Sequence, residues 1–286
     1  MRLFKDASYK FIESRRTAYV VSAIVIGVGI AGMGFNIATL GSWQNYGVDF
    51  LGGSLVQVAF DQPTSDAELR EALGGATAPP ITQFGGEGTG EFVIRAPLDE
   101  SVSITQVADN VESQIRANLP DKTFTVVRTE LVGAKVGGEL QQKALLAVLF
   151  SFLLTLIYLA FRFELRFGLA AVIATAHDIL ITLGFLAVFR VEIALPTVAA
   201  ILTILGYSLN DTIVVFDRIR ENMRMKGARK RDPVDLVNQS INETLPRTVL
   251  TSGTTLAVLA ALLILGGAVI RDFTIVLMLG VVIGTY

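Results

Sequence analysis

Residues 205–222 read LGYSLNDTIVVFDRIREN and place a carboxylate within an apolar segment. The apolar run begins near Ile193 and continues past Asn210 and Asp211 to Phe216. An aspartate at the centre of a membrane-spanning helix costs roughly 2.5–3.5 kcal/mol on insertion scales. Such residues normally face a bundle interior or a water-filled cavity, so Asp211 is the first candidate for a functional residue.

The whole chain has the composition of a membrane protein. Of its 286 residues, 52% are hydrophobic and 17% are charged, whereas a soluble domain carries roughly 25% charged residues. We expect a polytopic α-helical protein with six transmembrane helices, at residues 17–38, 144–161, 168–189, 193–216, 248–270 and 273–286. The last run stops at Tyr286 after about 14 residues, short of the ~20 that a span needs, which indicates a truncated helix.

Basic residues in short loops favour the cytoplasmic side of a membrane. They gather in the N-terminal segment 1–16 and in the loop 217–246, whereas the short loops on the other side hold only Arg190 and Arg271. We therefore expect a cytoplasmic N-terminus and an extracytoplasmic segment 39–142. A cleaved signal peptide is the alternative interpretation of the first run, but five further runs follow it.

The segment 39–142 is long enough to form a domain of its own. Alternating apolar residues predict strands, and helical spacing after a capping box at Ser65 and Glu68 predicts a helix. The expected strands are 54–60, 80–84, 91–96 and one that begins at Phe124, and the helices start near Ser65 and Ile104. Gly85, Gly86 and Gly88 would form the hairpin loop. The order βαββαβ predicts an α+β, ferredoxin-like periplasmic domain.

Gly27, Gly29 and Gly32 match the G-x-G-x-x-G pattern of dinucleotide-binding proteins. That pattern requires a strand before it and a helix after it, whereas these glycines lie inside a hydrophobic run. Small residues in such runs let helices approach closely. We expect helix packing here, and also at Gly280 and Gly284 in the last run.

Further polar residues lie in or beside the apolar runs. His177 and Asp178 could form a hydrogen bond between the third and fourth spans, or take part in ion movement. Asp211 and Arg247 lie near the same side of the membrane, and a guanidinium that approaches or withdraws would change the affinity of the carboxylate for a proton. A static salt bridge is the alternative.

The loop 217–246 begins with Asp217 and Arg218, which suit a solvated helix end. Asp232 followed by Pro233 predicts the start of a separate, interfacial amphipathic helix. Membrane topology already explains the basic residues 229–231, so no nucleic-acid partner is expected.

Other classes of site find little support. The chain has no cysteine, which excludes a disulfide and a thiolate metal site. No nucleophile–base pair, metal cluster or nucleotide loop stands out. We expect a protein that is not an enzyme and that has no cofactor or metal.

Several motifs together resemble the SecF family, the smaller subunits of the bacterial SecD–SecF export complex. The segment 47–53, GVDFLGG, is similar to the family signature at Gly47, Asp49, Phe50, Gly52 and Gly53, although Leu51 stands where threonine is common. Residues 209–218 resemble the family's fourth-span motif. The pairs His177–Asp178 and Arg247–Thr248 also fall where the family has them, although Pro246 departs from its pattern.

The resemblance implies a fold of the resistance-nodulation-division superfamily in the bacterial cytoplasmic (inner) membrane. It implies use of the proton motive force, with SecD, to promote preprotein translocation after or alongside the ATP-driven step. Asp211, Arg247 and Asn210 would form the proton-relay site, with secondary roles for His177, Asp178, Asp217, Arg218 and Thr248. The implied partners are SecD, the SecYEG translocon, YajC, YidC, unfolded preprotein, protons and the lipid bilayer.

Two other functions remain open at this point. One is a proton-driven exporter of small molecules or lipids built on the same core. The other is a translocon assembly scaffold that conducts nothing, in which the buried charges only hold helices together.

Overall fold

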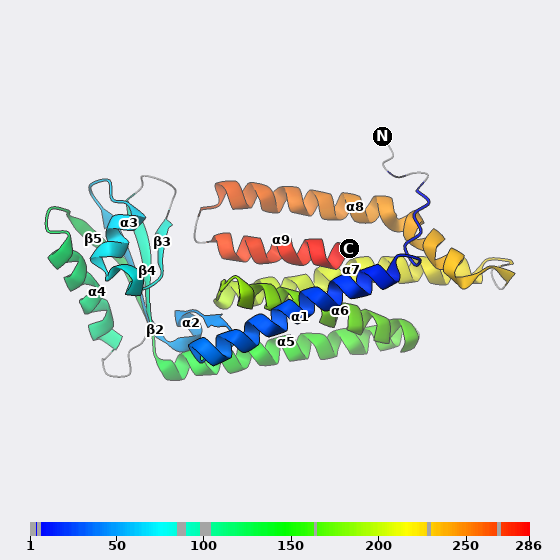
Figure 1. Ribbon diagram of the computed structural model, residues 1–286, viewed down its shortest axis with the longest axis horizontal. Helices are drawn as coiled ribbons and strands as arrows, with labels where there is room; N and C mark the ends of the chain where they lie inside the picture. The colour runs from blue at the N-terminus through cyan, green and yellow to red at the C-terminus, as the bar shows by residue number, and fades with distance from the viewer. Residues whose placement is uncertain are drawn as a thin grey trace.

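A computed structural model describes Phe4 and residues 7–84, 90–97, 104–162, 165–227, 230–267 and 270–286. Long helices form a bundle, and a small domain of strands and helices lies at one end of it (Figure 1). The first helix, α1 (Arg15–Leu40), begins at the opposite end and runs toward this domain. Gly41 ends it in a left-handed conformation with φ of 73°, which glycine adopts readily.

Among the described residues, five helices are long and apolar enough to cross a membrane. They are α1, α5 (Ala134–Arg162), α6 (Leu165–Val188), α7 (Leu195–Arg224) and α8 (Pro233–Leu265). The last helix, α9 (Arg271–Thr285), has 15 residues and packs against α7 and α8. The chain is therefore a multi-pass helical membrane protein.

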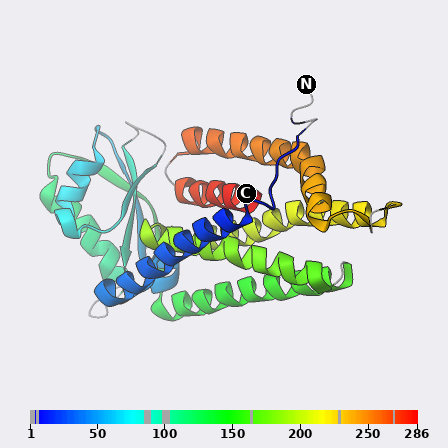
Figure 2. The ribbon, with the colours of Figure 1, turned by 45° about the vertical axis from the view of Figure 1, so that its right-hand side comes forward.

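The segment 217–246 differs from the prediction. α7 continues to Arg224, eight residues beyond the expected end of the span, and α8 is a single helix from Pro233 to Leu265. The prediction of a separate amphipathic helix before the fifth span is wrong, since that segment is the first part of α8. Pro246 lies inside the helix, where it removes one backbone hydrogen bond. Figure 2 shows a sharp bend in α8, and a proline is the usual cause of such a bend.

Gly29 and Gly32 of α1 are packing residues, whereas no atom of the described residues lies within 4 Å of a Cβ at Gly27, where the packing prediction is wrong. A Cβ atom on Gly29 would lie 2.7 Å from the Cα of Gly184 in α6, and one on Gly32 would lie 2.7 Å from the Val188 side chain. Gly280 and Gly284 of α9 contact Ile204 and Ser208 of α7 in the same way. The prediction of close helix contact is confirmed at these four positions.

The small domain has the expected βαββαβ order. Its elements are β2 (Gly53–Phe60), α3 (Asp66–Ala72), η1 (Gly75–Thr77), β3 (Ile81–Phe84), β4 (Glu91–Pro97), α4 (Ile104–Asn118) and β5 (Phe124–Val132). The strands form one antiparallel sheet in the order β3-β4-β2-β5. The predicted capping box is present, since Ser65 accepts from the Glu68 backbone and Glu68 accepts from the Ser65 backbone. Gly85, Gly86 and Gly88 lie outside the described residues.

One core holds the sheet and its helices together. The fully buried side chains include Val56, Phe92 and Ile94 from the sheet, Leu69 from α3 and Ile115 from α4. These come from the alternating positions of the strands and the apolar faces of the helices, so binary patterning alone determines this core.

We predict that Gly29→Val destabilises the protein by about 1–3 kcal/mol, because the methyl groups would meet the backbone of α6, which cannot move aside. The matched control is Gly27→Val, since nothing lies within 4 Å of a Cβ at Gly27. Thermal unfolding of both variants in detergent checks this. Equal midpoints would contradict the close contact of α1 and α6.

Candidate functional site

α7 carries Asp211 into the interior of the helix bundle. The residue is 6% exposed, and neither carboxylate oxygen has a hydrogen-bond donor within 3.5 Å among the described residues. Buried polar atoms are nearly always hydrogen-bonded. An aspartate with two buried, unsatisfied oxygens is therefore unusual among the described residues.

Arg247 and Thr248 lie on α8 beside this carboxylate. α7 and α8 pack against each other, and both residues are near enough to interact with Asp211. No nitrogen of Arg247 is within 4.0 Å of an Asp211 oxygen, and Arg247 is exposed. The structure thus brings the predicted pair together without closing the salt bridge that the static alternative requires.

A second carboxylate, that of Asp178 on α6, is also buried, but each of its oxygens has a hydrogen-bond partner. It accepts a hydrogen bond from Ser208 Oγ of α7 at 2.5 Å and lies 2.8 Å from His177 Nδ1. The predicted bond between the third and fourth spans is therefore present. His177 Nε2 lies 3.0 Å from Ser22 Oγ of α1, which lies 2.6 Å from Tyr286 Oη. A continuous polar chain thus crosses the bundle from α7 to the end of α9.

Sequence reasoning missed Tyr207, Ser208 and Thr285 among the hydroxyl residues of this region. Ser208 binds Asp178, and Ser252 of α8 lies 3.1 Å from Tyr207 Oη of α7 and 2.8 Å from Thr285 Oγ1 of α9. Hydroxyls in membrane helices commonly bond to their own helix, so they give a weak sequence signal. The spacing of three residues that places Ser208 and Asp211 on one face of α7 was the available clue.

Three further predicted residues lie away from this cluster. Asn210 is exposed. Asp217 is exposed and lies 3.4 Å from Arg162. Arg218 pairs with Glu243 of α8 and with Glu221, both at 2.6 Å. The pair with Glu243 links the last part of α7 to the first part of α8.

The signature segment joins the small domain to the bundle. β1 (Asn45–Tyr46) pairs in parallel with β6 (Glu192–Ile193), which directly precedes α7. The short helix α2 (Val48–Leu51) follows, and Phe50 is buried in a core formed with α6, α7 and α9. The Asp49 carboxylate accepts a hydrogen bond from the backbone N–H of Leu195, the first residue of α7, at 2.9 Å.

The glycines of the signature allow this contact. A Cβ on Gly52, whose φ is 81°, would lie 2.9 Å from the backbone nitrogen of Ala134. A Cβ on Gly47 would displace the Glu192 carboxylate. Gly53 adopts φ of 143° and begins β2. Larger residues would force the small domain away from the start of α5 and from β6.

Charged groups gather where the small domain meets the bundle. Arg95 of β4 lies 3.6 Å from Glu192 Oε1, which has no hydrogen-bond donor among the described residues. Burial raises the pKa of Glu192; Arg95 opposes this, whereas Asp272 and Asp49 add to it. The contact between the small domain and the bundle therefore contains a buried carboxylate whose pKa is raised.

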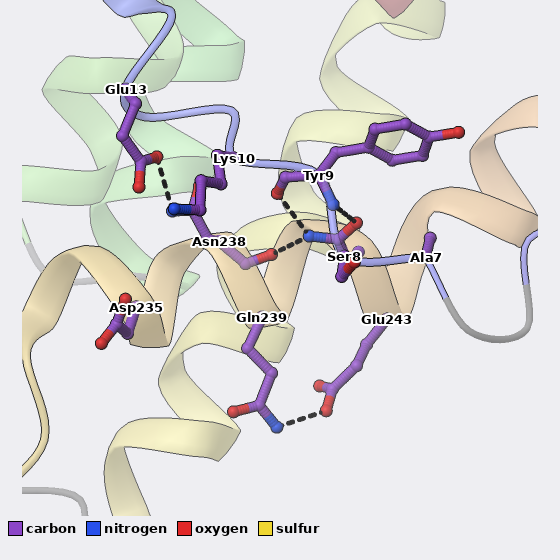
Figure 3. Close-up of a pocket in the computed structure, with 10 residues that line it drawn as sticks. Ala7, Ser8, Tyr9, Lys10, Glu13, Asp235, Asn238, Gln239 and Glu243 are labelled. Carbon is purple, nitrogen blue, oxygen red and sulfur yellow. Dashed lines mark hydrogen bonds between the residues drawn. The ribbon is translucent and has the colours of Figure 1, made fainter.

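A polar cavity of about 460 Å³ lies at the other end of the bundle, between the N-terminal segment and α8 (Figure 3). Asn242 accepts from the backbone N–H of Tyr9 at 2.9 Å and donates to its carbonyl at 2.8 Å. Asn238 accepts from the N–H of Ile12 and donates to Glu13, both at 2.9 Å. Its amide lowers the pKa of Glu13. These contacts hold the N-terminal segment against the first part of α8.

Two family models match the chain. "Protein export membrane protein SecD/SecF, C-terminal" matches residues 111–286, and "SecD/SecF GG Motif" matches residues 45–64, which include the signature segment. The protein translocase subunit SecF of Desulfurispirillum indicum is 44% identical over 281 residues, which cover 96% of this chain and 87% of the relative. The chain belongs to the SecF family. The SecF of Gemmatimonas aurantiaca is also 44% identical, over all of this chain and 85% of that relative.

Solved structures agree with membership of the SecF family. The crystal structure of SecDF, a translocon-associated membrane protein from Thermus thermophilus, matches all of this chain with a TM-score of 0.78 and 38% identity. This chain spans 38% of the length of that SecDF chain. SecDF in a super-membrane-facing form matches 98% of this chain with a TM-score of 0.70 and 37% identity, over 37% of its own length.

We predict that Ser208→Ala lowers the free energy of unfolding by about 1–2 kcal/mol, because the buried Asp178 carboxylate loses one of its two partners. Thr203→Ala is the matched control, since Thr203 is exposed on the same helix and bonds only to its own backbone, at Ala199. Thermal unfolding in detergent measures both. A larger loss in the control would contradict the assignment.

Glu192 should make stability depend on pH. Its pKa in the native state is raised above the ordinary 4.5, so between these two values the native state holds a proton that the unfolded chain releases. Stability therefore falls as pH rises through this window, by at most about 1.4 kcal/mol per pH unit. Glu192→Gln should remove this decline, and Glu71→Gln, at an exposed position of α3, should leave it unchanged. Unfolding midpoints measured from pH 4 upward, about the ordinary pKa of a glutamate, check the sign.

Proposed function

We propose that this chain is the SecF subunit of a SecD–SecF complex in the bacterial inner membrane, which uses the proton motive force to promote preprotein translocation by the Sec machinery. Its similarity to proteins named protein translocase subunit SecF, and to the translocon-associated SecDF, supports the assignment to this machinery. SecD would supply the part of the complex that SecDF carries beyond the 38% matched here. SecYEG, YajC, YidC and unfolded preprotein are further proposed partners.

The proposal includes the finer architecture. The sheet order β3-β4-β2-β5 with two helices supports a ferredoxin-like domain, which we assign to the periplasm. α9, which packs against α7 and α8, supports a sixth span. The basic residues of the N-terminal segment and of the connection between α7 and α8 support a cytoplasmic N-terminus.

One observation carries the proton-coupled mechanism: Asp211 is buried, and both its oxygens lack donors among the described residues. Such a carboxyl group favours its neutral form, and an approaching guanidinium favours the charged form. Arg247 lies near but is not bonded, which supports a site with two arrangements. One charge that crosses 100 mV gains about 2.3 kcal/mol, so a few protons suffice to bias a domain rearrangement.

A scaffold function has one specific observation in its favour. The Asp178–Ser208 and Arg218–Glu243 contacts each join two helices and need no proton transfer. They do not account for Asp211, whose oxygens join nothing among the described residues. We therefore favour the proton-coupled function.

Asp211→Asn tests the proposal. The amide has the shape of the carboxylate but cannot exchange a proton, so translocation driven by the proton gradient should fall to near the level measured without this chain. Export of a preprotein into inverted membrane vesicles, with and without a proton gradient, measures the effect.

Asp235→Asn is the matched control, because Asp235 is exposed at the start of α8. Both variants must copurify with SecD for the comparison to count. Gradient-dependent export that survives in Asp211→Asn would favour the scaffold function instead.

A further inference from the structure

We propose that Asp49 is a positioning residue for Asp211: by capping the first turn of α7, it fixes where α7 lies relative to α8. The inference rests on the proposed function in one respect, namely that the position of Asp211 beside Arg247 determines its protonation. The cap and its effect on helix position stand on geometry alone.

The backbone N–H of Leu195, at the start of α7, has its hydrogen-bond acceptor far away in the sequence. The first N–H groups of a helix have no partner within the helix. Ala194 occupies the N-cap position and has no side-chain oxygen, and Pro196 has no N–H. Asp49, 146 residues earlier, accepts from the N–H of Leu195 at 2.9 Å. Its negative charge also favours the positive end of the helix dipole.

Asp49 is itself held firmly on both sides. Before it, the N–H of Gly47 donates to the carbonyl of Ile193 at 2.9 Å, within the parallel pairing of β1 and β6. After it, Phe50 is 4% exposed in the bundle core. A Cβ on Gly137 of α5 would lie 2.7 Å from the Phe50 carbonyl, so α5 also confines this turn. The Asp49 carboxylate therefore has a fixed position, and its hydrogen bond to Leu195 fixes the start of α7.

Leu195, which Asp49 caps, and Asp211 belong to the same unbroken helix, so the position of the first affects the position of the second. α7 has 30 residues, and Leu195 and Asp211 are 16 positions apart. At 1.5 Å per residue this is about 24 Å. A helix transmits an axial shift or rotation over that length, so release of the cap would change how Asp211 faces α8.

The first experiment measures the cap and the helix position directly, in the full chain with SecD in membranes. Asp49→Ala should speed hydrogen exchange at the start of α7 by about tenfold, whereas Asp49→Asn keeps an acceptor oxygen and should change it less. The chain has no native cysteine, so spin labels at Thr203 of α7 and Leu250 of α8, both exposed, report the distance between the helices. Asp49→Ala should shift or broaden the distribution of that distance, and Asp49→Asn should largely restore the original distribution.

The second variant removes the donor instead of the acceptor. Leu195→Pro deletes the N–H at a helix position that tolerates proline, and the Leu195 side chain is 44% exposed. In that background, Asp49→Ala should cause little further change in exchange or distance. A full additional change would show that the Leu195 N–H is not the target and would overturn the proposal.

The functional readout is the pH profile of gradient-driven export. Asp49→Ala should shift its midpoint, Asp49→Asn should restore it, and Asp109→Ala, at an exposed position of α4, should leave it unchanged. Unchanged exchange and distance in Asp49→Ala would overturn the proposal. A uniform loss of export with an unshifted midpoint would mean a merely structural role and would also overturn it. Failure of the proposed function appears separately, as normal export in Asp211→Asn.

Discussion

The structure depends on how each buried carboxylate in an apolar bundle is satisfied. Asp178 has two partners, on α6 and α7, and these contacts hold the helices in place. Asp211, three residues after Ser208 on α7, is equally buried and has no donor among the described residues. In a medium without water an unsatisfied charge is expensive. The two aspartates therefore differ: Asp178 links two helices, whereas the Asp211 carboxylate is buried without a hydrogen-bond donor among the described residues.

The helix that carries Asp211 is held at both ends. At its start, the signature segment contributes the Asp49 carboxylate and the pairing of β1 with β6. Near its far end, Arg218 pairs with Glu243, and Asn222 donates to Ser240, both on α8. α8 is bent (Figure 2), and Pro246, the usual kind of residue at such a bend, comes directly before Arg247. α7 is thus fixed between the small domain and the first part of α8, whereas the second part of α8 leaves the bend in a new direction.

Much of the fold could be predicted because it rests on local patterns. Long apolar runs identify the membrane helices, and period-two alternation with a capping box identifies the strands and α3 of the small domain. One wrong prediction, a separate helix before the fifth span, followed a local sequence signal that tertiary contacts overrule. Asp232 and Pro233 predicted a separate helix, yet this helix continues through Pro246 as α8, and its first part contacts α7 and the N-terminal segment.

The sequence by itself determined that Asp211 and Asp178 are costly residues, that Arg247 lies on the same side, and that the signature segment is unusual. Only the tertiary structure decided which of these groups are bonded. Asp49 meets Leu195 across 146 positions, Ser22 meets Tyr286 across 264, and Asn242 meets Tyr9 across 233. Such partners share no period or spacing, because they are brought together by the packing of separate helices, and packing is a property of the whole chain.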